Sequence, residues 1–236
     1  QTGLKECVEI EEYEAQGDVL IRVTFTGGAS LRNVSDFKGW GKIWYEIGRG
    51  IALAHDKTPE DIRVIGATKG SIVIELAALA SIAGTTSYII MEGLKVAEKV
   101  LDIRKKAEEL KGLKLKNSAL AQDLEKCADE EKAEAVESIT KDAASKLEIN
   151  PKKDGDKILA LNKSVELLLD FVENGGEVDF VMHDDSDSEE EDQELVEELK
   201  TLRSNFSQIR VLEDKIKALE DSTHRKPNQA GDDNSE

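Results

Sequence analysis

An uncharged apolar segment near the middle of the chain most constrains the fold. Residues 76–91 contain no Asp, Glu, Lys or Arg, and Glu75 and Glu92 flank them. This segment is shorter than the ~20 residues that a helix needs to cross a bilayer. We therefore expect a buried core helix that begins near Ala77 and continues to Lys111. The alternative is a helix that inserts into a membrane after a trigger, as in a membrane-disrupting effector.

A predicted strand lies upstream of this segment. Residues 18–26 alternate apolar and polar side chains, which is the period of a half-buried strand. Residues 4–14 precede them across a Gly-containing turn and predict the other strand of a hairpin. Gly27 ends the second strand, and Ser30 is expected to cap a helix over residues 31–54.

A second hairpin is predicted where residues 62–67 and 72–76 flank the turn Lys69-Gly70-Ser71. The turn only superficially resembles a phosphate-binding loop, because Lys precedes Gly and a hairpin replaces the required strand and helix. Lys69, Gly70 and Ser71 remain the candidate ligand loop of an alternative in which the protein is a nucleotide sensor or an enzyme.

These units predict an α+β domain over residues 1–116, with a mainly antiparallel sheet covered by helices. Two topologies fit the pattern. One is ββαββα; the other is a ferredoxin-like βαββαβ with a helical insertion, closed by a strand at residues 177–182. The segment 117–182 also holds two predicted helices, one ending before Pro151 and one beginning near Gly155.

The first predicted helix carries an apolar stripe that includes Trp40 and Trp44, four residues apart and therefore on one face. Lys38 and Lys42 lie beside them, so a base-stacking strip is the less favoured alternative to a core position. Glycines inside a helix are unfavourable and indicate close backbone packing, or a ligand against that backbone. The helix has four of them: Gly39, Gly41, Gly48 and Gly50.

The charge is divided unevenly between the two halves of the chain. Residues 1–117 hold 17 Lys and Arg against 17 Asp and Glu, so the net charge of -18 arises beyond them. Residues 183–192 are expected to form a solvated acidic linker, and residues 223–236 a polar tail. Such a field disfavours binding to nucleic-acid backbones. It leaves open a surface that attracts a basic partner, or an acidic mimic of nucleic acid.

The segment 193–222 has the most regular apolar pattern, with spacings of three and four residues typical of a coiled coil. We expect this helix to bind a protein partner or a second copy of the chain, which makes a homo-oligomer the favoured assembly. The predicted interface consists of Leu195, Leu199, Leu202, Phe206, Ile209, Leu212, Ile216 and Leu219.

Reactive chemistry is scarce in the sequence. The three His residues are far apart, and His183 with its neighbouring Asp residues is better explained as a loop than as a metal site. No catalytic residue, cofactor or metal site is predicted, and we lean against an enzyme. Cys7 and Cys127 cannot form a disulfide framework, and no secretion signal opens the chain, so we expect a cytoplasmic protein and no membrane role.

One resemblance adds to this interpretation. It rests on Phe25-Thr26-Gly27, on the Trp-bearing helix 40–51, and on the hairpin 65–76 with its Gly-Ser turn. In these features residues 19–113 resemble accessory domains of prokaryotic conflict, or anti-phage defence, systems. The resemblance implies a sensing or assembly part placed beside an effector. The expected function is therefore a non-catalytic module for protein–protein interaction or oligomerisation.

Overall fold

A computed structural model describes residues 18–68, 72–113, 118–181 and 191–224. The predicted first strand, ligand loop Lys69-Gly70-Ser71 and nearly all of the acidic linker and tail lie outside these ranges. Short 3₁₀ turns occur at Gly27–Ala29 and Pro59–Asp61. The strands and α-helices are β1 (Asp18–Phe25), α1 (Val34–Ala54), β2 (Arg63–Thr68), β3 (Ile72–Leu79), α2 (Ala80–Gly112), α3 (Ser118–Lys146), α4 (Gly155–Glu173), β4 (Glu177–Val181) and α5 (Glu191–His224).

The four strands form one antiparallel sheet in the order β2-β3-β1-β4. The predicted α+β class with an antiparallel sheet and helices is thus confirmed. In β1, Ile21, Val23 and Phe25 are buried, as the period-two pattern predicts. On the opposite face Arg22 forms an ion pair with Glu75 of β3, at 3.1 Å.

The start of α1 differs from the sequence-based expectation. The helix begins at Val34 and is capped by Asn33, whose side chain accepts hydrogen bonds from the backbone N–H groups of Ser35 and Asp36. Ser30, the predicted cap, instead donates its hydroxyl to the carbonyl of Gly27, at 2.7 Å. The 3₁₀ turn after β1 occupies Ser30 and shifts the helix by about one turn.

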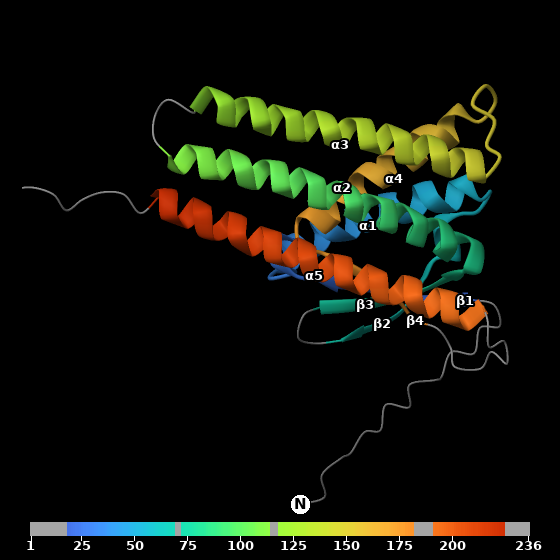
Figure 1. Cartoon of the computed structure of the whole chain (residues 1–236). Coiled ribbons are helices and arrows are strands. Elements are labelled where there is room, and N and C mark those ends of the chain that lie inside the picture. The colour runs from blue at the N-terminus through green and yellow to red at the C-terminus, as the bar shows by residue number, and fades with distance from the viewer. Residues whose placement is uncertain (1–17, 69–71, 114–117, 182–190, 225–236) are drawn as a thin grey trace, which may run out of the picture.

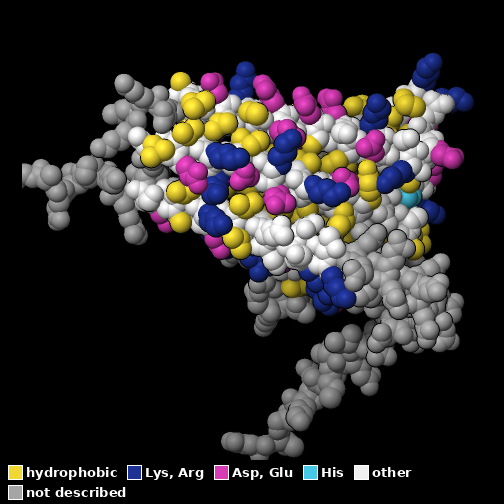
Figure 2. Space-filling view, viewed as in Figure 1, with side chains coloured by type: hydrophobic (Ala, Val, Ile, Leu, Met, Phe, Trp, Pro, Cys, Tyr) yellow, Lys and Arg dark blue, Asp and Glu magenta, His cyan; other side chains and the backbone are white. Residues whose placement is uncertain are grey.

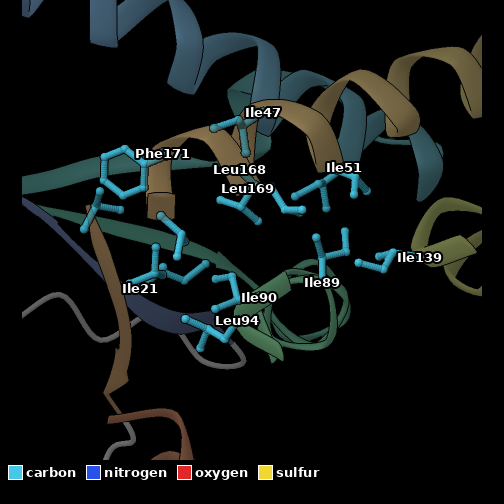
Figure 3. Close-up of a cluster of buried hydrophobic side chains, with 14 of the residues drawn as sticks. Ile21, Ile47, Ile51, Ile89, Ile90, Leu94, Ile139, Leu168, Leu169 and Phe171 are labelled. Carbon is cyan, nitrogen blue, oxygen red and sulfur yellow. The ribbon is translucent and has the colours of Figure 1, made fainter. Parts of the chain in front are cut away.

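The uncharged segment is divided between β3 and the first turns of α2. Ile82, Ile89 and Ile90 are buried, which confirms the core helix, although it begins at Ala80. Figure 3 shows Ile89 and Ile90 in the cluster formed with Ile47 of α1 and Leu168 of α4. Within the described ranges, no helix has the length and apolar character required to cross a bilayer.

Three long helices, α2, α3 and α5, lie side by side in Figure 1, with α1 and α4 behind them. Charges of both signs intermingle on the visible face over these helices (Figure 2). Several carboxylates of α3 are paired with bases of α2, among them Glu131 with Lys99 at 2.6 Å and Asp129 with Arg104 at 3.2 Å. This face is therefore not a surface of a single sign.

The last helix, α5, packs against α2 and β4. Arg203 donates to Asp179 of β4 at 2.8 Å, and Arg210 forms an ion pair with Glu177. Among the described strands β4 pairs with β1 alone, and α5 packs beside β4 at this end of the sheet. At the opposite edge, β2 pairs with β3 alone among the described strands.

Candidate functional site

An apolar pocket lies between α1 and the inner face of the sheet, with a volume of about 390 Å³. Of the described residues that line it, none is charged. Ile21 of β1 and Leu76 of β3, which are register partners, form part of the sheet wall. Volumes of roughly 300–1,000 Å³ are typical of sites for small ligands. We take this pocket as the candidate functional site.

The spacing of residues along α1 creates the helical wall of the pocket. Phe37, Gly41, Trp44, Gly48 and Ile51 all line it and follow one another at intervals of four and three residues. At 3.6 residues per turn this spacing keeps them on one side of the helix. Gly41 and Gly48 have no side chains, and this leaves space between that side of the helix and the sheet.

An aromatic cluster closes the inner end of the pocket. Trp44 and Phe171 meet edge to face, with ring centroids 5.1 Å apart, and Trp40 and Phe25 contact the same Phe171 ring at 5.3 and 5.4 Å. Gly176 permits this arrangement, because a Cβ there would overlap the Phe171 ring. The prediction that the tryptophans face the core is confirmed, since both pack against it.

The four glycines of α1 have different surroundings. A Cβ on Gly50 would collide with the backbone of Ala160 in α4, so packing explains this position. A Cβ on Gly48 would come within 3.2 Å of the Ile62 side chain. A Cβ on Gly39 or on Gly41 would meet no atom of another element within 4 Å, and of these two only Gly41 lines the pocket.

The mouth of the pocket is marked by its most exposed lining residues. Phe37 and Tyr45 of α1 are 59% and 54% exposed, and Val64 of β2 is 69% exposed. Exposed apolar side chains around a concave site are typical of ligand or partner binding. The pocket therefore opens to solvent between α1 and β2.

Polar groups near the pocket offer little chemistry. The hydroxyl of Thr86 already donates to the carbonyl of Ile82, at 2.8 Å. Trp44 Nε1 is buried without a partner. His55 shares a hydrogen bond of 2.8 Å with Thr85, and burial lowers its pKa, which favours the neutral imidazole. The described residues contain no cluster of His, Cys, Asp or Glu suited to hold a metal ion.

The predicted interface of the last helix faces its own chain. Leu202, Phe206 and Ile209 are buried in the core, with exposed fractions of 1%, 6% and 3%. Leu212 and Ile216 pack partly against the same core, and Leu219 is half-buried. In this arrangement the side chains of Leu202, Phe206 and Ile209 are covered by the rest of the same chain and are not available to a second copy. Leu195 and Leu199 belong to α5, but their side chains lie outside the description.

Sequence reasoning gave a ligand against the glycine-bearing helix only as an alternative to close packing, and it did not predict the pocket itself. Gly41 and Gly48 alternate with Phe37 and Tyr45 on one flank of the helix, and that combination of small and large residues is unusual for a packed stripe. Comparison with known proteins adds no further indication, because no family model, curated protein or solved structure matches the chain.

Proposed function

We propose that this chain is a non-catalytic binding protein and that the pocket between α1 and the sheet is its binding site. The observation that carries the proposal is an open pocket of about 390 Å³ with an uncharged lining and an exposed aromatic rim. The proposal retains the expected interaction role. It assigns this role to the pocket instead of the predicted interface on α5. The resemblance of residues 19–113 to accessory domains of defence systems agrees with this proposal, because a sensing domain needs a site that binds a ligand.

A binding role is favoured over catalysis by the chemistry of the lining. Catalysis needs a nucleophile, base or metal held in reach of the bound group. The polar side chains lining the pocket are those of Thr86, Tyr45 and the two tryptophans. Thr86 is the only aliphatic hydroxyl among them, and its proton is engaged with a backbone carbonyl.

We also propose a ferredoxin-like βαββαβ arrangement for β1, α1, β2, β3, α2 and β4, with α3 and α4 as the helical insertion. What supports it is the sheet order, in which β1 lies between β3 and β4 with all neighbours antiparallel. In this arrangement α1 connects β1 to β2, and the pocket lies beneath that connecting helix.

Intrinsic fluorescence offers a direct test of the binding site. Trp40 and Trp44 are the two tryptophans of the chain, and both line the pocket. We expect the dye 1-anilinonaphthalene-8-sulfonate, which has apolar aromatic rings and one sulfonate, to bind the folded protein and quench their emission. Gly41→Phe places a ring in the pocket and should abolish this signal.

Gly39→Phe is the matched control, because it makes the same change two residues away, outside the pocket lining. It should leave the quenching intact. Loss of the signal in both variants, or in neither, contradicts the proposed site. Circular dichroism of each variant verifies that the helix content is unchanged.

A further inference from the structure

We infer that the pocket takes the hydrocarbon tail of a free fatty acid, whose carboxylate stays at the mouth beside Lys38 and Lys42. This inference rests on the proposed function and names the ligand of that site. It follows from three features: a lining that is almost entirely apolar, the size of the pocket, and the position of basic side chains on α1.

The interior selects a tail without hydrogen-bonding groups. The accessible lining is mainly aliphatic and aromatic, and the Thr86 hydroxyl already has its acceptor. Trp44 Nε1 is buried without a partner and could donate one hydrogen bond, which does not satisfy a ligand that carries several polar groups. A peptide segment placed here would leave backbone groups unpaired, at about 1–3 kcal/mol for each buried group. A phosphate group buried inside the pocket would lack cations, because none of the described residues that line it is charged. A hydrocarbon chain has neither polar backbone groups nor a phosphate charge, so its burial in the pocket leaves no group unpaired.

The size suits a flexible chain better than a single ring. An engineered apolar cavity of about 150 Å³ binds benzene. The present pocket, at about 390 Å³, is more than twice as large and is bounded by a helix on one side and a sheet on the other. A saturated tail can fold to fill such a space.

The mouth supplies the complementary charge. Successive residues of a helix are rotated by about 100°, so Lys38, Arg49 and Lys42 follow directly beyond Tyr45 around α1. Arg49 is paired with Glu46 at 3.1 Å. Lys38 and Lys42 are both exposed, on the side of α1 next to Tyr45 at the pocket entrance. These positions favour an anionic head outside an apolar tail.

The test titrates the full chain with monomeric saturated fatty acids of increasing length, and with the alcohols of the same lengths, and follows the change in tryptophan emission and the displacement of the bound dye. We expect affinity for the acids to rise about fourfold per added methylene until the pocket is filled. The double variant Lys38→Glu/Lys42→Glu should weaken acid binding several-fold and leave alcohol binding unchanged. Gly41→Phe should abolish both, and Gly39→Phe neither.

The outcomes separate this inference from the proposed function. If the dye binds in a Gly41-dependent way but the acids do not, the fatty-acid inference is overturned and the binding site stands. If acids and alcohols bind equally and the double variant changes neither, the role of the two lysines is overturned. If no apolar probe binds, both proposals fail. A Gly41-dependent association with phosphatidylglycerol vesicles, without monomer binding, would replace the free acid by a membrane lipid.

Discussion

Ser164 of α4 occupies the space that a side chain on Gly50 of α1 would need. Its hydroxyl donates to the carbonyl of Ile47, at 2.9 Å, across the same helix contact. The two helices can approach this closely only because position 50 has no Cβ. The contact therefore holds α1 against α4 at this point of the helix.

The first prediction concerns this contact. Gly50→Ala should destabilise the protein by about 1–3 kcal/mol, since the new methyl overlaps backbone atoms of Ala160 that cannot move aside easily. Gly39→Ala is the control, and it should stabilise by up to about 1 kcal/mol because its site is open and alanine favours helix. Urea unfolding measures both. Equal effects would contradict the packing role of Gly50.

A second prediction concerns a pH dependence at Glu213 of α5. Burial raises the pKa of Glu213 from 4.5 to about 7, and its Oε1 has no hydrogen-bond partner. The folded state therefore holds a proton that the unfolded chain releases above pH 4.5. Stability from this group should be complete below pH 4.5, fall as pH rises toward 7, and level off above it.

Because Glu213 is partly exposed, solvent screening limits this loss to about 1 kcal/mol. Glu213→Gln should flatten the dependence of unfolding free energy on pH between 5 and 8 in chemical denaturation. Asp221→Asn, at an exposed position of the same helix, should leave the slope in place. An unchanged slope in the Gln variant would refute the assignment.

The third prediction concerns the buried carboxylate of Glu173, whose side chain is 5% exposed. It accepts from Lys132 of α3 at 2.9 Å and from Arg104 of α2 at 3.2 Å. Lys132→Met should cost about 2–3 kcal/mol, because one partner of a buried charge is removed. Lys126→Met, in an exposed pair, should cost less than about 0.5 kcal/mol. Similar losses in the two variants, measured by thermal unfolding, would argue against this role.

The fourth prediction tests whether α5 packs on its own chain or extends from it and acts only in assembly. Leu202→Ala should destabilise the protein by about 2–5 kcal/mol, as expected for a leucine buried in the core. Val211→Ala, at a position 52% exposed on the same helix, should change stability by less than about 0.5 kcal/mol. If α5 acted only in assembly, Leu202→Ala would instead change the mass measured by light scattering. The unfolding midpoint of the rest of the chain in urea would then stay the same.

Local signals in the sequence were sufficient for most elements. The alternation in residues 18–26 predicted β1, and the strand expected at residues 177–182 corresponds to β4 (Glu177–Val181). The start of α1 was missed because Ser30 and Asn33 are both good caps. The choice between them depends on the 3₁₀ turn that precedes the helix.

The placement of α5 and the pocket could not be predicted in the same way. A stripe such as Leu202, Phe206 and Ile209 has the same spacing whether it packs on a second copy or on its own α2. Likewise the pocket arises where α1 and three strands meet, and the sequence pattern gives no distance between them. Both depend on tertiary packing, which periodicity does not encode.

The unequal edges of the sheet limit how copies of this fold can join through their strands. Within the described part of the chain, α5 packs beside β4, while β2 has a neighbour on one side only. Fibril growth by strand addition needs two receptive edges on every unit. A unit with one receptive edge can pair once, edge to edge, and that pairing closes the assembly at two.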